Sequence, residues 1–132
     1  MVDTNVLLSS FIGSGPPRLI LNRIRDGRDL LCLSAQILEE YLEVLHRAGI
    51  PEDLLRPLFS LFQDSDHVIL TTPTRRIALI RDDPSDNMFL ECATEARADF
   101  LISGDRHLKK LRRFQDIEIV TPREYLERLR HE

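Results

Sequence analysis

Residues Phe100-Leu101-Ile102-Ser103-Gly104-Asp105 begin as an apolar run of strand length and end in an acidic residue. A stretch whose apolar residues recur at helical spacing precedes this run, and a short basic stretch follows it. A continuous apolar run of this length is typical of a strand that is buried on both faces of a parallel sheet. We therefore predict a buried strand over residues 100–102, with Asp105 just beyond its carboxyl end.

The rest of the chain repeats this alternation of short apolar runs and helical patterns. Further strands are predicted at the start of the chain up to Asp3 and over residues 30–33, 68–70 and 117–120, and helices over 16–26, 34–47, 51–62, 86–97, within 106–113 and from 122 onward. Residues 75–81 show no clear pattern. Strands that alternate with helices indicate an α/β fold. We expect a three-layer α/β/α sandwich with a central, mostly parallel sheet of four to five strands.

The composition narrows the class of protein. A chain of 132 residues is the size of one ordinary domain, so residues 1–132 are predicted to form a single domain. The net charge of −4 argues against a protein with a uniformly basic surface, although basic residues cluster within 106–113. Cys32 and Cys92 are expected to be buried and reduced. The short apolar stretch near the start supports neither export nor a membrane span.

Acidic residues recur where predicted strands end or where helices begin or shortly afterwards: Asp3, Glu40, Asp86 and Asp105. The carboxyl ends of parallel strands share one edge of a sheet, so these side chains can meet there. Ionised carboxylates in one cleft repel each other unless a cation neutralises them or their pKa values rise. A site made of oxygen ligands favours Mg²⁺ or Mn²⁺. The pattern therefore indicates metal-dependent phosphoryl chemistry.

Each of these acids also has an ordinary structural interpretation. Asp3, Asp86 and Asp105 sit where aspartate often caps a turn or a helix. Glu40 competes with its neighbours Glu39 and Glu43, any of which can be a solvated residue of a helix. The basic stretch 106–113 is either the solvated face of an amphipathic helix or a contact for a phosphate backbone. No nucleophilic triad, histidine metal site or glycine-rich phosphate loop is present in the sequence.

The order and spacing of several motifs resemble those of the PIN-domain family, in particular the small prokaryotic toxins of toxin–antitoxin pairs. The motifs that carry the resemblance are Asp3-Thr4-Asn5-Val6-Leu7, Leu38-Glu39-Glu40-Tyr41, Asp83-Pro84-Ser85-Asp86-Asn87, Ala98-Asp99-Phe100-Leu101-Ile102-Ser103-Gly104-Asp105 and Ile119-Val120-Thr121-Pro122. Together they span nearly the whole chain. In this alignment of motifs Glu40, not Glu39, matches the helical acid of the family.

The resemblance implies a divalent-metal-dependent endoribonuclease that uses Mg²⁺ or Mn²⁺. Asp3 would be the central ligand, Glu40 and Asp86 would complete the acidic pocket, and Asp105 would bind the metal directly or through water. Asn5 and Ser103 match positions that support the site by hydrogen bonding. The resemblance further implies an RNA substrate, an antitoxin protein as partner, a homodimer or higher oligomer, and a cytoplasmic protein without membrane contact.

One departure from the family pattern concerns the first strand. Only Met1 and Val2 precede Asp3, whereas family members have several apolar residues there. Either the chain starts further upstream or the first strand is truncated and the sheet is weakened at its centre. An extended N-terminus is then expected to raise the melting temperature, since a central strand contributes burial and hydrogen bonds.

Two other classes of protein compete with this interpretation. A catalytically silent PIN-like module would bind RNA or a protein partner without cleavage, but an unused carboxylate cluster would carry a repulsive cost. A phosphoacceptor receiver domain would need an acidic pair at its first strand and a lysine after its last, and this sequence has neither. A small DNA-binding protein encoded beside this one would favour a toxin, and its absence would favour a housekeeping nuclease.

Overall fold

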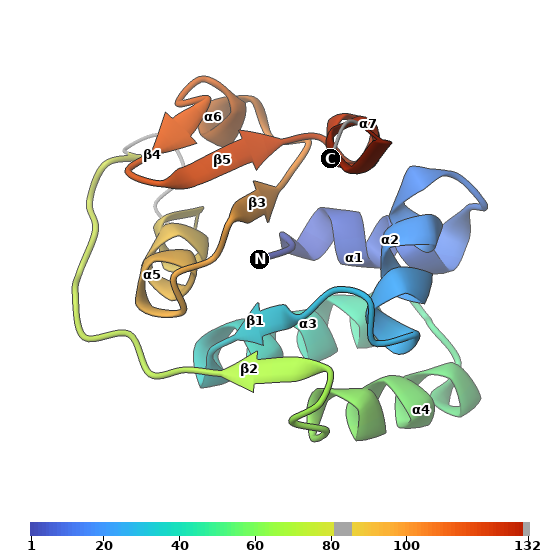
Figure 1. Cartoon of the computed structure of the whole chain (residues 1–132). Helices are drawn as coiled ribbons and strands as arrows, with labels where there is room; N and C mark the ends of the chain where they lie inside the picture. Colours follow the sequence, from blue (N-terminus) through green and yellow to red (C-terminus); the bar gives the residue numbers. More distant parts are fainter. Residues whose placement is uncertain (81–85, 131–132) are drawn as a thin grey trace.

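A computed structural model describes residues 1–80 and 86–130, and Figure 1 shows how the helices and strands are arranged. The strands are β1 (Leu31–Leu33), β2 (Val68–Leu70), β3 (Phe100–Ile102), β4 (Arg113–Phe114) and β5 (Ile117–Val120). The helices are α1 (Thr4–Ile12), α2 (Pro16–Arg25), α3 (Ala35–Arg47), α4 (Glu52–Phe62), α5 (Asn87–Glu95), α6 (Arg106–Lys109) and α7 (Pro122–Arg130). This alternation confirms the predicted α/β class.

The strands form two small sheets instead of one. β1 pairs in parallel with β2, while β3 pairs in parallel with β5, and β4 joins β5 antiparallel. The described residues therefore show no clear central sheet of the four to five strands that were predicted. Sequence patterns show which segments are extended, but pairing between them depends on contacts far apart in the chain.

The first residues of the chain run beside β3, and Figure 1 places the N-terminus between β3 and β1. The amide of Ile102 donates to the Met1 carbonyl at 2.8 Å, and the amide of Asp3 donates to the Ile102 carbonyl at 3.0 Å. Val2 makes a single parallel bridge to Ile102 and accepts a hydrogen bond from the buried Tyr41 hydroxyl of α3. Asp3 then caps α1, so the extended segment ends before it can join the two sheets.

Most predicted elements are confirmed within a residue or two. The predicted helix starting at Ser34 forms, with the Ser34 hydroxyl accepting from the Ile37 amide at 3.2 Å. Three local predictions were incomplete: α1 was not expected, α6 stops after one turn at Lys109, and β4 forms where the basic helix was expected to continue. Residues 83–85 of the motif Asp83-Pro84-Ser85-Asp86-Asn87 lie outside the described residues.

The core lies between the two sheets and the helices that cover them. Its fully buried side chains come from every part of the fold, among them Leu33, Tyr41, Leu90, Leu101 and Leu108. Cys32 and Cys92 are both buried and free, as predicted. The strand ends are thus held by close packing from several elements, which fixes the residues that follow them.

A capping box formed by Thr121 and Glu124 begins α7, and its glutamate is linked to α6. The Glu124 carboxylate accepts from the Thr121 amide at 2.9 Å, the Glu124 amide donates to the Thr121 hydroxyl at 3.1 Å, and the Lys109 ammonium pairs with the same carboxylate. These donors, with Lys109 the largest contributor, lower the pKa of Glu124 to about 2.

The Glu124 carboxylate stabilises the fold at pH values above 4.5, the pKa of this group in the unfolded chain. This stabilisation is lost as the pH falls toward about 2, the pKa of the group in the folded protein. We expect Glu124→Gln to remove most of this pH dependence, because the glutamine oxygen still accepts from Thr121 but has no charge for Lys109. The loss at pH 7 should stay below about 1 kcal/mol, since the pair is partly exposed. Urea unfolding between pH 2.5 and 7 measures the free energy of unfolding of both proteins. The same pH dependence of this free energy in the wild type and in Glu124→Gln would contradict the prediction.

Candidate active site

The four acids identified from the sequence line one small cavity of about 140 Å³. They come from four separate parts of the chain: the end of the first extended segment, α3, the start of α5 and the end of β3. The complete lining is Asp3, Thr4, Asn5, Glu40, Val44, Asp86, Phe89 and Asp105. The fold therefore brings together carboxylates that lie up to 102 residues apart in sequence.

Asp3 lies deepest in this group, with 4% of its surface exposed. Its Oδ1 accepts from the Val6 amide at 2.9 Å, which caps α1, and its Oδ2 accepts from the Ser103 hydroxyl. Burial raises the pKa of Asp3, and the nearby charges of Asp105 and Glu40 raise it further, against the lowering effect of the two hydrogen bonds. The site thus disfavours negative charge at Asp3 as long as nothing neutralises it.

Ser103 joins Asp3 to Asp105. Its hydroxyl is fully buried, donates to Asp3 and accepts from the Asp105 amide at 2.9 Å. Asp105 is half-buried and caps α6, with its Oδ1 accepting from the amides of His107 at 2.8 Å and Leu108 at 3.3 Å. One serine therefore fixes the carboxylate at the end of the first segment and the backbone at the end of β3.

Glu40 reaches the cavity from the second turn of α3. It is half-buried, accepts a hydrogen bond from the Thr4 hydroxyl and borders both this cavity and a larger neighbouring pocket, whereas the exposed Glu39 lines only the larger pocket. Glu43 lines that larger pocket as well. The helical phase therefore directs only Glu40 of these three toward Asp3.

Asp86 occupies the N-cap position of α5, and 6% of its surface is exposed. It makes no side-chain capping hydrogen bond to its helix, in contrast to Asp3 and Asp105. The structural interpretation as a cap thus holds for the latter two acids and not for Asp86. Its position in the lining gives its carboxyl group access to the cavity.

The chemistry of these side chains can be compared with the needs of a metal ion. Among the described residues, no three His, Cys, Asp or Glu side chains form a group that could hold an ion by themselves. Mg²⁺, however, is usually held by one or two carboxylates and keeps several of its waters. The oxygen donors, the burial and nearby carboxylates that raise the pKa of Asp3, and the free volume fit an ion of that kind.

A model of the PIN domain family matches residues 1–107. The chain belongs to the PIN domain family. PIN domains are typically nucleases, and all four acids of the cavity lie within the matched residues. Comparisons with curated proteins and with solved structures find no match. Membership in the family supports hydrolase activity at the level of nucleases.

Thr4 is a polar lining residue of this PIN domain that the sequence did not single out. Its hydroxyl bonds Glu40 and it is buried, so it joins the first turn of α1 to α3 across the cavity. Its position directly after Asp3 was the only available signal. The predicted supporting residue Asn5 is exposed and lines the cavity, but none of the described hydrogen bonds involves its side chain.

Within residues 1–80 and 86–130, no helix has the length and apolar character that crossing a membrane requires.

Proposed function

We propose that this PIN domain is an endoribonuclease that hydrolyses RNA phosphodiester bonds with Mg²⁺ or Mn²⁺. The observation that carries the proposal is the single cavity lined by Asp3, Glu40, Asp86 and Asp105. Carboxylates that repel each other in a partly buried cleft are costly to keep for structural reasons alone. A divalent cation held by these carboxylates would offset that cost.

The burial of each acid suggests its role in binding the ion. Asp3 and Asp86 are buried and would hold the ion, with Glu40 and Asp105 at more accessible positions of the same cavity. Bound there, a divalent ion supplies a water of lowered pKa and neutralises charge on the phosphate. Ser103 would orient Asp3 for that role through its hydrogen bond.

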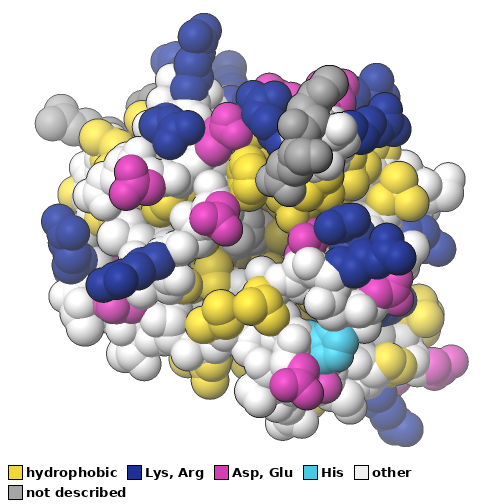
Figure 2. Space-filling view, viewed as in Figure 1, with side chains coloured by type: hydrophobic (Ala, Val, Ile, Leu, Met, Phe, Trp, Pro, Cys, Tyr) yellow, Lys and Arg dark blue, Asp and Glu magenta, His cyan; other side chains and the backbone are white. Residues whose placement is uncertain are grey.

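The RNA backbone would approach along basic residues next to Asp105. Arg106, Lys110, Arg112 and Arg113 are exposed, whereas Lys109 is paired with Glu124. On the face shown in Figure 2, basic and acidic side chains of the described residues are interspersed, so a broad basic surface does not cover it. Contacts between the exposed basic residues next to Asp105 and RNA phosphates would position the RNA backbone without recognising its base sequence.

The biological setting that fits such an enzyme is the toxin of a toxin–antitoxin pair in the cytoplasm. The partner would be an antitoxin protein, and the toxin would form a homodimer or higher oligomer. Co-expression with the protein encoded by the neighbouring gene tests this setting. A stable complex that suppresses cleavage would support it, and an unaffected rate with every neighbouring product would argue for a housekeeping nuclease.

The activity itself is tested with purified protein and a labelled single-stranded RNA. We expect internal cleavage with Mg²⁺ or Mn²⁺ and none with EDTA, since the carboxylates alone provide no activated water. The variant Glu39→Gln should cleave at the wild-type rate, because Glu39 lies outside the cavity. Retention of RNA without cleavage under every metal condition would instead establish the catalytically silent module.

A further inference from the structure

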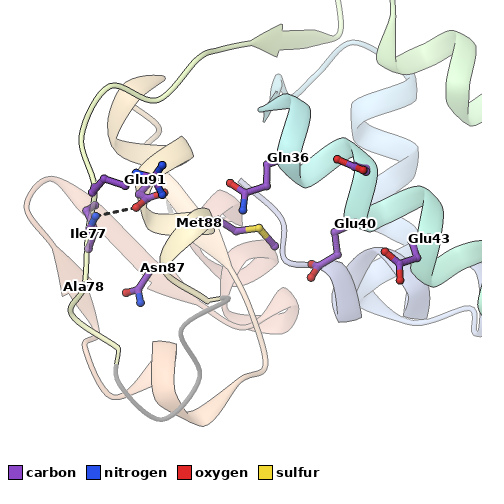
Figure 3. A pocket seen from close by; sticks show the side chains of 10 residues that line it. Gln36, Glu40, Glu43, Ile77, Ala78, Asn87, Met88 and Glu91 are labelled. Atoms are coloured by element: carbon purple, nitrogen blue, oxygen red, sulfur yellow. Dashed lines mark hydrogen bonds between the residues drawn. The ribbon is translucent and has the colours of Figure 1, made fainter.

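Residues 71–80, which we call the strap, connect β2 to the region before α5 without regular secondary structure. Side chains of α5 bind the strap backbone at regular intervals. The Glu95 carboxylate accepts from the Thr74 amide at 2.8 Å, the Glu91 carboxylate accepts from the Ile77 amide at 2.8 Å, and the Asn87 side chain binds Ile80. Residues four apart share one face of a helix, so a single face of α5 holds the strap. Figure 3 shows the Glu91 bond and Asn87 further along the same helix.

The bond pair made by Asn87 differs from the other two attachments. Its Oδ1 accepts from the Ile80 amide at 2.9 Å, and its Nδ2 donates to the Ile80 carbonyl at 2.9 Å. Both residues are buried, with 7% and 6% of their surfaces exposed. A side-chain amide is suited to this task because it carries a donor and an acceptor together. Since water reaches neither bond readily, losing them would leave buried polar groups unsatisfied.

This pair of bonds links the first residue of α5 to the strap. Asn87 is the first residue of the helix and Asp86 is the N-cap before it. The Asn87 side chain thus ties the first turn of α5, next to Asp86, to Ile80 of the strap. Asp86 in turn lines the acidic cavity. A displacement of the start of α5 would therefore be transmitted directly to that carboxylate.

We propose that Asn87 is a positioning residue, whose paired hydrogen bonds to Ile80 hold Asp86 in place at the acidic cavity. This inference rests on the proposed function, because it gives Asp86 a role in metal binding. Asn87 itself lines the larger neighbouring pocket of about 530 Å³ and not the acidic cavity. It therefore acts through Asp86 and not by contact with the reacting groups.

The test compares Asn87→Leu with Glu91→Leu in the full chain. Both changes remove one attachment of the strap on the same helix face, one turn apart, and only the first lies next to Asp86. Calorimetric titration with MnCl₂ measures ion binding directly, thermal melting measures folding, and RNA cleavage gives kcat and KM. Asn87→Ser, whose hydroxyl is too short to make both bonds, replaces Asn87→Leu if that variant does not fold.

We expect Asn87→Leu to weaken Mn²⁺ binding by about tenfold or more and to lower kcat more than it raises KM, as losses of residues that orient metal ligands do. Glu91→Leu should lower the melting temperature but bind Mn²⁺ as the wild type does. Equal effects of both variants on Mn²⁺ binding, or unchanged binding in Asn87→Leu, would overturn the inference while leaving the proposed function intact. A wild-type protein that neither binds Mn²⁺ nor cleaves RNA would overturn both.

Discussion

Replacement of Asp3 by asparagine is expected to abolish RNA cleavage and, at the same time, to raise the melting temperature. Asparagine has the shape of aspartate and is an equally good N-cap, so its oxygen can still accept from the Val6 amide. It has no charge to offer a metal ion. Since even the partners that orient metal ligands contribute about 10–100-fold to activity, loss of the proposed central ligand should lower activity by more than about 100-fold.

The gain in stability follows from the direction of the Asp3 pKa. Burial and two neighbouring carboxylates raise this pKa in the folded state above its ordinary value of 3.8. The contribution of Asp3 to stability is therefore complete below pH 3.8 and is lost as the pH rises through the folded-state pKa. At pH 7 in EDTA, Asp3→Asn should melt several degrees above the wild type, and the difference should shrink toward pH 4.

The matched control for this experiment is Asp116→Asn, which makes the same chemical change at an exposed residue outside the cavity. It should leave both cleavage and melting unchanged. Cleavage by Asp3→Asn at the wild-type rate would remove Asp3 from the site. A lower melting temperature for Asp3→Asn at neutral pH would show that ionised Asp3 is stabilised by its hydrogen bonds more than it is penalised by burial.

Ser103→Ala is expected to have the second large effect, because one hydroxyl serves two acids of the cavity. Its removal takes a donor from the Asp3 carboxylate and an acceptor from the Asp105 amide in a fully buried position. Loss of a partner for buried polar groups costs about 1–3 kcal/mol in the free energy of unfolding. Misorientation of Asp3 should lower cleavage by about 10–100-fold.

Ser10→Ala separates the local effect of Ser103 from general destabilisation. Ser10 is also buried and donates to a backbone carbonyl within α1, but it is not part of the acidic cavity. Its loss should reduce stability and leave the rate of cleavage per folded molecule unchanged. If chemical denaturation and cleavage assays show that Ser103→Ala loses no more activity than Ser10→Ala, then Ser103 has only a structural role.

Local sequence patterns predicted most helices and strands of the fold. Ser34 before the apolar periodicity of α3, and Thr121 with Glu124 before α7, are capping signals whose hydrogen bonds form within a few residues. The apolar run over residues 100–102 likewise predicted β3, with Asp105 just beyond its end. Such features could be predicted because the atoms that determine them are close together in the chain.

The pairing of the strands could not be predicted in the same way. Whether Met1 and Val2 extend a sheet depends on β3, about 100 residues away, and on the cap that Asp3 provides for α1. The apolar character of residues 6–8 is equally compatible with a strand and with the helix that forms. The hydrogen bond from Thr4 to Glu40 likewise joins two helices whose approach depends on the whole core. The placement of the acids around one cavity follows from the α/β order, whereas their catalytic roles stay predictions.

The division of the strands into two sheets has a thermodynamic consequence for ligand binding. Glu40 belongs to the helix that follows β1, whereas Asp105 follows β3, so the cavity lies between the two sheets. An ion held there would connect the β1–β2 sheet with the β3–β5–β4 sheet, which the described strand pairings do not join, since the Val2 bridge reaches only β3. Separation of the two sheets and release of the ion would then be one coupled equilibrium. At Mn²⁺ concentrations above saturation, each tenfold increase in free Mn²⁺ should raise the free energy of separating the two sheets by about 1.4 kcal/mol.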